Sequence, residues 1–307
     1  MKVLITGAAG YFGRSILPTL ADDPTISEIV ATDLAPPPFT HPKLRFERRD
    51  LVADGAEDLL PGMDAAIHLA FVVERKPGQD HAALNVTAAR RFLTAAAAQV
   101  DVLVVASSVM AYGLRSEPFD RLREDDPPGP GRGFYYAEEK LALERMLDGL
   151  EGKARIVKAR PCVVGGPGVP AYRAAAYRGK AFLMPRTAHP LRYQLLHEDD
   201  LGPAFRALLD APAGAYNVAP DDEITTVEAA RLLGKRPVAL PMGLCTAFMD
   251  LTWRLGLSHL DGGWARSLGY PTHVVDNAKL RARGWAPRFT TRDALFAMAG
   301  DSSRRNG

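Results

Sequence analysis

The sequence predicts an α/β protein built on a doubly wound parallel sheet, with a smaller and mostly C-terminal region covering one edge of that sheet. Three observations predict this fold. Short β-branched runs alternate with longer segments whose apolar residues recur about every 3.6 positions. A glycine-rich turn follows the first run directly, and the alternation becomes irregular after residue 165.

The first half of the chain contains most of the expected elements. The expected strands are residues 2–6, 28–33, 44–49, 65–70, 102–107 and 155–160. The expected helices are residues 13–21, 81–99 and 134–150, which are rich in Ala, Leu, Glu and Arg. A helix at 200–210 and a strand at 215–219 are expected to return to the main sheet. We therefore predict a larger unit of residues 1–164, joined by 192–219, and a smaller one of residues 165–191 and 220–307.

Composition excludes several function classes. The 307 residues carry a formal net charge of only +2, and no block of like charges appears, which argues against nucleic acid as a partner. Cys162 and Cys245 lie far apart without a C-x-x-C spacing, so we expect no disulfide framework, no metal site and a cytoplasmic location. No stretch is long and apolar enough to span a bilayer, so no membrane partner is expected.

The turn at residues 6–13, TGAAGYFG, carries the signal for a cofactor. Gly7 permits a tight turn, Gly10 lets the backbone approach a pyrophosphate, and Gly13 lets helix and strand pack closely. The second expected strand ends in Asp33, about twenty residues further on, where a carboxylate can bind the adenosine ribose. This context favours a Rossmann-type fold that binds NAD, with NADP less favoured because Asp33 repels a 2′-phosphate. The alternative is a glycine-rich turn without a ligand.

Tyr136 and Lys140 are candidate catalytic residues. They lie four residues apart in an expected helix, so they share one face, whereas the neighbouring Tyr135 has Glu139 at that spacing. A phenol with a pKa of about 10 is a poor base at neutral pH. A fixed ammonium close by can lower that pKa by at most about three units, to about 7. The same pair also occurs on ordinary exposed helices, so its place after the fifth strand carries the prediction.

Ser108 follows the fifth expected strand, at the edge where open α/β sheets bind ligands. A hydroxyl at this edge can hold the oxygen of a substrate. The alternative is an ordinary turn in which Ser107 and Ser108 satisfy backbone groups.

Together these segments resemble the extended short-chain dehydrogenase/reductases, the family that includes nucleotide-sugar epimerases and dehydratases. The resemblance covers nearly the whole chain. It rests on residues 6–13, Asp50-Leu51, His68-Leu69-Ala70, Asn85, the Ser-x-x-x-Tyr-Gly run at 108–113, Tyr136 with Lys140, Arg160-Pro161, Leu196-His197-Glu198-Asp199-Asp200 and Gly284-Trp285-Ala286-Pro287.

The resemblance implies roles for these residues. Ser108, Tyr136 and Lys140 would be catalytic, with Asn85 supporting their hydrogen-bond network. The cofactor-binding residues would be Gly7, Gly10, Tyr11, Phe12, Gly13, Asp33, Asp50, Leu51, Leu69, Ala70, Tyr136, Lys140 and Pro161. His68 and His197 are expected to serve packing or strand-end hydrogen bonding rather than proton transfer.

One departure from the family pattern bears on the substrate. Many nucleotide-sugar members carry an arginine four residues before the His of the His-x-x-Asp segment, and here that residue is Tyr193. Arg192 is adjacent, but one residue along a strand points to the opposite face. This change weighs against a sugar nucleotide and leaves the hydride chemistry untouched.

The leading hypothesis is NAD(P)-dependent hydride transfer at a secondary alcohol or ketone carbon of a small molecule, leaning to an epimerase or dehydratase that acts on a sugar-nucleotide-like substrate. One alternative is a dehydrogenase or ketoreductase of a non-nucleotide small molecule. Another is a non-catalytic protein that senses the cofactor or serves as a scaffold. The lid residues Met242, Phe248, Trp253 and Trp264 are candidates to line the substrate pocket or to belong to the core.

The helices expected at 81–99 and 134–150 are the ones that the family usually pairs into a dimeric contact. The first contains a run of small residues at 95–98 that would permit close packing between subunits. An alanine-rich helix that lies against its own sheet is an equally good interpretation.

Overall fold

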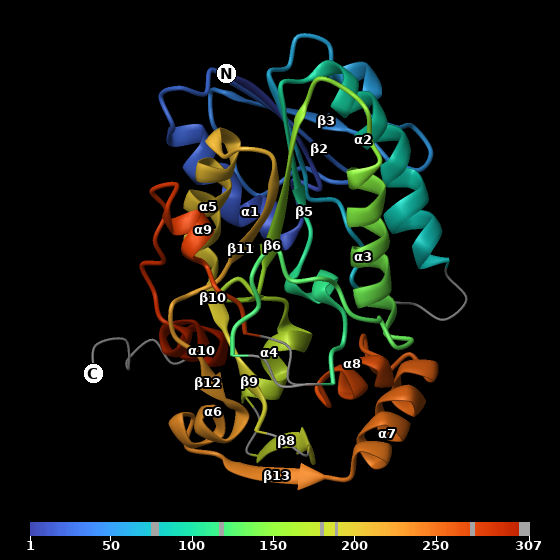
Figure 1. Ribbon diagram of the computed structural model, residues 1–307, viewed down its shortest axis with the longest axis vertical. Helices are drawn as coiled ribbons and strands as arrows, with labels where there is room; N and C mark the ends of the chain where they lie inside the picture. Colours follow the sequence, from blue (N-terminus) through green and yellow to red (C-terminus); the bar gives the residue numbers. More distant parts are fainter. Residues whose placement is uncertain (75–79, 117–119, 179–180, 188–189, 271–273, 301–307) are drawn as a thin grey trace.

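A computed structural model of the chain describes residues 1–74, 80–116, 120–178, 181–187, 190–270 and 274–300. Its central sheet is parallel throughout, with the strand order β11-β6-β5-β4-β1-β2-β3 (Figure 1). The strands are β1 (Lys2–Thr6), β2 (Glu28–Asp33), β3 (Leu44–Arg48), β4 (Ala65–His68), β5 (Val102–Ala106), β6 (Arg155–Pro161) and β11 (Gly214–Val218). The order reverses between β1 and β4, which confirms the doubly wound, Rossmann-type prediction.

Helices cover both faces of this sheet. On one face lie α1 (Tyr11–Asp22) and α5 (Glu198–Asp210), and on the other lie α2 (Ala88–Gln99) and α3 (Tyr135–Asp148) (Figure 1). The strands alternate between two core clusters, because successive side chains of a strand point to opposite faces. Val3 and Ile5 belong to the cluster under α1 and α5, whereas Leu4 belongs to the cluster under α2 and α3.

Most expected elements end within two residues of the observed ones, and one helix differs in kind. The single helix expected at 81–99 is divided into a π-helical turn, η2 (Ala83–Thr87), and the regular helix α2. Such turns occur often at functional sites, and this one carries Asn85. Two short 3₁₀ turns, η1 (Glu57–Leu59) and η3 (Val109–Tyr112), complete the larger unit.

Except for the helix α9 (Ala278–Arg281), which lies beside α5 and β11, the lid elements lie beyond the carboxyl ends of the strands, toward the lower part of Figure 1. They are β7 (Val163–Gly165), α4 (Ala171–Arg178), β8 (Ala181–Pro185), β9 (Arg192–Tyr193), β10 (Leu195–His197), β12 (Ile224–Thr225), α6 (Thr226–Leu232), β13 (Arg236–Leu240), α7 (Met242–Arg254), α8 (Gly262–Ser267), α9 (Ala278–Arg281) and α10 (Thr291–Ala299). The short strands pair as β10 with β7, β12 with β9, and β13 with β8. Within residues 192–219, α5 and β11 pack in the larger unit, whereas β9 pairs with the lid strand β12.

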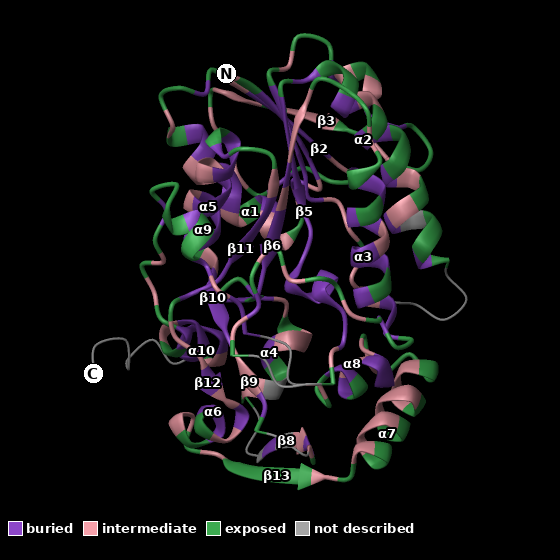
Figure 2. Cartoon of the chain, viewed as in Figure 1, coloured by how far each residue is buried: buried purple, intermediate pink, exposed green. Residues whose placement is uncertain are grey.

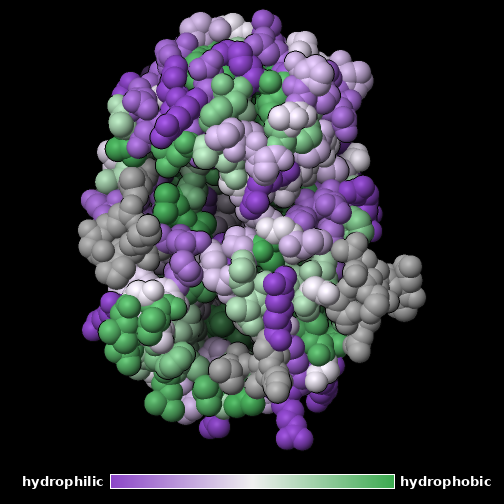
Figure 3. Space-filling view, turned by 180° about the vertical axis from the view of Figure 1, so that it is seen from behind, coloured by the Kyte–Doolittle hydropathy of each residue, from purple (hydrophilic) through white to green (hydrophobic). Residues whose placement is uncertain are grey.

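Burial differs sharply between the two regions. The strands of the main sheet are mostly buried, whereas α7 contains no buried residue and β13 is exposed along most of its length (Figure 2). Seen from behind, hydrophobic residues gather on the surface at the end of the lid where α7 lies (Figure 3). In the described part of the chain, no helix combines the length and hydropathy needed to cross a bilayer.

Candidate active site

The glycine-rich turn between β1 and α1 depends on two close backbone approaches. Gly7 has a φ of +74°, and a Cβ on it would stand 2.5 Å from Ala70 N. A Cβ on Gly13 would stand 2.2 Å from Ala8 O, so any side chain there would separate the helix from the turn. Gly10 is the N-cap of α1 and supplies no side-chain cap. The first N–H groups of α1 are therefore free to receive an anion, and this cradle fits the pyrophosphate of a dinucleotide.

The carboxylate of Asp33, at the end of β2, is held against this turn. Its Oδ2 accepts a hydrogen bond from Ala9 N at 2.9 Å, and its Oδ1 accepts one from Leu34 N at 2.7 Å. Asp50 and Leu51 lie in the turn after β3, and Leu51 packs against the core cluster under α2. The acid thus stands at the strand end where an adenosine ribose binds in this type of fold.

The other predicted cofactor residues lie at the same edge of the sheet. Leu69 and Ala70 follow β4 directly, and Ala70 is the residue that Gly7 approaches. Tyr11 and Phe12 begin α1, and Pro161 ends β6. The structure therefore brings residues from the ends of β1, β4 and β6 and from the start of α1 together at the carboxyl edge of the sheet. The sequence had predicted each of these positions separately.

The candidate catalytic residues come from two neighbouring elements. Tyr136 and Lys140 lie on the first two turns of α3, and Ser108 is the N-cap of η3, just beyond β5. The Lys140 Nζ donates a hydrogen bond to the Ala106 carbonyl oxygen at 2.9 Å, which ties α3 to the last residue of β5. The neighbouring Tyr135 points elsewhere, because its hydroxyl donates to the Val73 carbonyl oxygen at 2.6 Å.

Burial dominates the electrostatics of this pair. Desolvation raises the pKa of Tyr136 above its ordinary value, while a hydrogen bond with Ser108 and the charge of Arg173 lower it by less. Desolvation also lowers the pKa of Lys140 to about 7, against the opposing charges of Glu144 and Glu139. That Lys140, together with the positive charge of an oxidised nicotinamide, brings the phenol near neutrality stays a prediction. Within the chain itself burial outweighs the neighbouring groups, a cost of removing both side chains from water that helical spacing does not record.

Two aromatic side chains complete the surroundings of Tyr136. The Phe71 ring meets the Tyr136 ring edge-on, with centroids 5.6 Å apart, and lies 3.5 Å from the Lys140 Nζ, measured to its centroid. The Trp264 ring, from the lid helix α8, stacks on Tyr136 at 5.5 Å. Sequence reasoning had named Trp264 as a pocket candidate but missed Phe71. The sequence signal that could have identified Phe71 is its position directly after the segment His68-Leu69-Ala70.

Asn85 fastens the segment that carries Phe71. Its Oδ1 accepts a hydrogen bond from Val72 N at 2.7 Å, and its Nδ2 donates to the Val72 carbonyl oxygen at 2.9 Å. The same Nδ2 donates to Glu139 Oε2 at 2.7 Å. Asn85 thereby connects the segment after β4 to α3, the helix that carries Tyr136 and Lys140.

A buried ion pair fixes α3 from its other side. The Arg160 Nε and Nη2 donate to Glu144 Oε1 and Oε2 at 2.9 and 2.6 Å, a two-pronged contact that fits the planar guanidinium. Ser107 Oγ also donates to Glu144 Oε1, at 2.5 Å. Ser107 is thus committed to the scaffold, and Ser108 is the serine placed beside Tyr136.

Comparison with known proteins decides the family. A model of the NAD dependent epimerase/dehydratase family matches residues 3–219, which run from β1 to just past β11. The chain belongs to the NAD-dependent epimerase/dehydratase family. It is therefore an NAD-dependent enzyme.

Individual relatives of this epimerase/dehydratase chain are distant. An uncharacterized protein of Mycobacterium tuberculosis is 28% identical over 321 residues, which cover 95% of this chain and 82% of that protein. The UDP-glucuronic acid 4-epimerase of Bacillus cereus has a TM-score of 0.75 at 19% identity, with 98% of each chain covered. The UDP-glucose 4-epimerase of Thermus thermophilus, solved with NAD, has a TM-score of 0.72 at 22% identity, with 100% of each covered. These similarities establish the shared fold.

The two histidines of the family motifs have structural partners. His68 Nδ1 shares a hydrogen bond with Thr6 Oγ1 at 2.8 Å, and burial lowers the pKa of His68 to about 3. His197 caps α5, because its Nδ1 accepts from Asp199 N at 3.2 Å, and its ring stacks on Phe289 at 4.1 Å. Both placements agree with the packing roles expected for them.

The position where many nucleotide-sugar members of the family carry arginine is filled differently here. Tyr193 packs against the lid cluster around Leu195 and Ile224. Its neighbour Arg192 forms an ion pair with Glu223. Arg192 is thus engaged by a carboxylate of this chain.

A second set of arginines gathers elsewhere around a cavity of about 350 Å³. Its lining residues are Leu114, Arg132, Arg186, Thr187, Met242, Arg266, Gly269 and Tyr270. The Arg132 guanidinium lies over the Tyr270 ring at 5.1 Å, and Arg132 is the described non-glycine residue with a positive φ, of 52°. That conformation costs about 1 kcal/mol and persists where the surrounding structure imposes it. A carboxylate, that of Asp250, stands 3.8 Å from Arg266, whereas Arg132 donates to the neutral Leu114 carbonyl and Ser116 hydroxyl.

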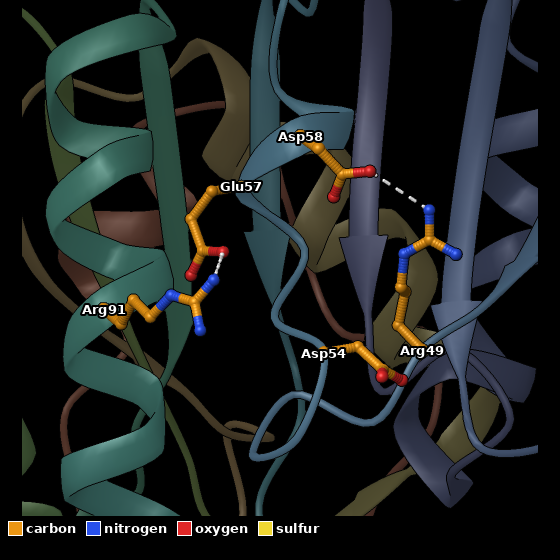
Figure 4. Close-up of a pocket in the computed structure, with 5 residues that line it drawn as sticks. All are labelled: Arg49, Asp54, Glu57, Asp58 and Arg91. Carbon is orange, nitrogen blue, oxygen red and sulfur yellow. Dashed lines mark hydrogen bonds and ion pairs between the residues drawn. The ribbon is translucent and has the colours of Figure 1, made fainter.

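A larger depression of about 590 Å³ lies beside η1 and α2 (Figure 4). Its charges are internally paired: Arg91 with Glu57 at 2.9 Å, and Arg49 with Asp58 at 3.1 Å. Because both guanidinium groups of this depression already face carboxylates, the cavity lined by Arg132, Arg186 and Arg266, which we call the arginine cavity, is the better candidate for binding an anion.

Proposed function

We propose that this chain binds NAD and transfers hydride between the nicotinamide and a secondary alcohol or ketone carbon of a sugar-nucleotide-like substrate, as an epimerase or dehydratase. One observation carries the proposal: Tyr136, Ser108 and Lys140 meet beside the end of β5, next to Phe71. The residue before Phe71 is Ala70, which touches the glycine-rich turn. The proton-handling residues and the dinucleotide cradle are thus joined by one short segment.

The residues of this chain handle the proton while bound NAD supplies the acceptor for the hydride. The phenolate oxygen of Tyr136 takes the hydroxyl proton of the substrate. At the same time the C–H bond of the substrate's alcohol carbon breaks, and that carbon forms a C=O bond. Ser108 donates a hydrogen bond to the same oxygen and holds it in place. Lys140, when protonated, stabilises the phenolate. In an epimerase the hydride returns to the opposite face of the ketone, so no net oxidation occurs.

Asp33 supports NAD as the cofactor in preference to NADP. Its carboxylate is held by two backbone N–H groups at the end of β2, so it cannot swing far away from the ribose position. A 2′-phosphate placed there would meet a fixed negative charge.

The arginine cavity, lined by residues of both units, supports an anionic substrate. Three guanidinium groups, those of Arg132, Arg186 and Arg266, line one cavity. Arg132 lies four residues before Tyr136, in the chain segment that leads into α3. Arg266 lies two residues after Trp264, which stacks on Tyr136. The same two chain segments therefore line the cavity and the proposed catalytic site. Guanidinium groups bind phosphate through paired hydrogen bonds. We propose that the phosphate end of the substrate occupies this cavity.

Incubation of the purified protein with NAD and either UDP-glucose or UDP-glucuronic acid tests the function. We expect the 4-epimer to appear by NMR without accumulation of reduced nicotinamide. Steady accumulation of reduced cofactor would favour the alternative, a dehydrogenase of a small molecule. NAD that remains bound through purification supports the epimerase, whereas a site that is empty until NAD is added supports the dehydrogenase.

The remaining expectations extend this proposal. We propose that residues 1–164 with 192–219 bind the cofactor, and that 165–191 with 220–307 bind the substrate. We further propose a cytoplasmic enzyme, consistent with the free cysteines Cys162 and Cys245, and a homodimer through α2 and α3. Light scattering that gives a monomer mass at micromolar concentration would refute the dimer.

A further inference from the structure

The inward side of the lid helix α7 carries polar side chains among apolar ones. The Asp250 Oδ1 accepts a hydrogen bond from Gly262 N at 2.7 Å, at the first turn of α8. Thr246 lies against the same residue, since a Cβ on Gly262 would stand 2.7 Å from the Thr246 methyl carbon. The contact between α7 and α8 is therefore made in part by a carboxylate and a hydroxyl-bearing side chain.

The outward side of α7 is apolar. Leu244, Phe248, Leu251 and Leu255 are 62, 66, 57 and 63% exposed, and they recur at intervals of four, three and four residues, which places them on one helix face. Leu257, just beyond the helix, is 77% exposed and extends this surface. We call these five residues the α7 face. Phe248 thus lies neither in the substrate pocket nor in the core, the two places expected for it.

Single exposed apolar side chains are common on protein surfaces. An aligned row of large apolar side chains is not, because it leaves a contiguous apolar area in water, and such an area marks an interaction site. Figure 3 shows the gathering of hydrophobic residues at this end of the lid. The α7 face runs along the whole helix, so α7 could lie with its axis parallel to the surface of a bilayer and its apolar side chains toward the acyl chains.

The charge around the α7 face selects the partner. Residues 235–260 contain Lys235, Arg236 and Arg254 but a single acid, Asp250, which is engaged with α8. Arg254, the last residue of α7, is exposed beside Leu255, and Arg236 is exposed at the start of β13, the strand whose other end leads into α7 through Pro241 (Figure 1). An acid from outside the segment, Glu74, lies 3.0 Å from the His259 ring and is paired with it. The surface therefore combines exposed leucines and a phenylalanine with exposed cations.

We propose that the α7 face docks this enzyme reversibly on the surface of a bilayer that contains anionic phospholipid. Leucine and phenylalanine side chains enter the boundary between headgroups and acyl chains, while the arginines meet lipid phosphates. A second copy of the chain fits less well, because it would bury the arginines of both subunits against a segment, residues 235–260, whose single acid, Asp250, is already engaged with α8. The proposal goes beyond the proposed function and does not rest on it.

Sedimentation with vesicles tests the docking. We expect the full-length protein to sediment with vesicles of phosphatidylcholine mixed with phosphatidylglycerol, and less with phosphatidylcholine alone. The double variant F248S/L251S should lower the partition coefficient by roughly tenfold or more for each apolar side chain removed. The variant R236Q/R254Q should lower it by about fivefold for each charge, and only on the anionic vesicles.

The matched control is Val52→Ser, because Val52 is 55% exposed on the opposite region of the molecule. It should sediment like the wild type. Since the altered side chains are exposed, all variants should keep the wild-type melting temperature and NAD binding, which separates docking from the catalytic proposal. The proposal is overturned if the wild type sediments with neither vesicle, if F248S/L251S sediments unchanged, or if light scattering shows that F248S/L251S dissociates a dimer.

Discussion

The Trp264 indole, on the lid helix α8, lies against the phenol ring of Tyr136, on α3, with ring centroids 5.5 Å apart and planes inclined by 29°. The Trp264 Nε1 also donates to the Tyr135 hydroxyl at 3.3 Å. The lid and α3 are therefore in direct contact at Tyr136, the residue that we propose to be catalytic. Any shift of α8 would change the surroundings of that phenol.

Replacement of Trp264 by Ala should lower kcat/KM by about fivefold, because a stacked aromatic pair contributes about 1 kcal/mol. NAD affinity should stay unchanged, since Trp264 belongs to the lid. Steady-state kinetics and a separate NAD titration measure the two effects. Trp264→Phe keeps a ring against Tyr136 and serves as the matched control, so an equal loss in both variants would contradict the stacking role.

Lys140 should make stability depend on pH. Burial lowers its pKa from 10.5 to about 7, so between these values the unfolded chain binds a proton that the folded chain does not. The free energy of unfolding should therefore rise with pH through this window, by a few kcal/mol at most. Urea unfolding near pH 7 and near pH 9 measures the rise. Lys140→Met cannot be protonated, so its curve should be flatter, and equal slopes would refute the low pKa.

Asp33 should set the choice between the two dinucleotides. In Asp33→Asn the carboxylate charge is lost but the side chain keeps its size, so the affinity for NAD should fall and that for NADP should rise, each by about tenfold. Fluorescence titrations with the two cofactors give the ratio. Asp22→Asn, at the exposed end of α1, is the control. If Asp33→Asn leaves the ratio of the NAD and NADP affinities unchanged, the adenosine ribose of the cofactor does not bind beside Asp33.

Asn85 should stabilise the segment that carries Phe71. Asn85→Ala removes three hydrogen bonds and leaves the peptide groups of Val72 without these partners, so the free energy of unfolding should fall by about 2 kcal/mol. Asn85→Asp should be worse, because it faces the carboxylate of Glu139. Chemical denaturation measures both losses. An aspartate variant as stable as the wild type would contradict the contact with Glu139.

The parts of the site that follow strand ends were predictable from the sequence. Ser108, Asp33 and the glycine-rich turn lie where a parallel sheet opens to a ligand, and hydrophobic periodicity locates those strand ends. The ends of β4 and β5 differ from expectation by one or two residues, because the chain leaves the sheet to build the site. The lid was expected only as a region, because its short strands lack a periodic pattern long enough to identify.

The sequence by itself determined the doubly wound sheet, the glycine cradle and the pairing of Tyr136 with Lys140, because each follows from local spacing. Tertiary structure alone decided that Phe71 and Trp264 enclose the phenol, that burial shifts both pKa values of the pair, that three arginines share one cavity, and that α7 faces outward with its apolar side. Those features join residues far apart in the chain, and their energies depend on how much water the packed fold removes, which no local pattern records.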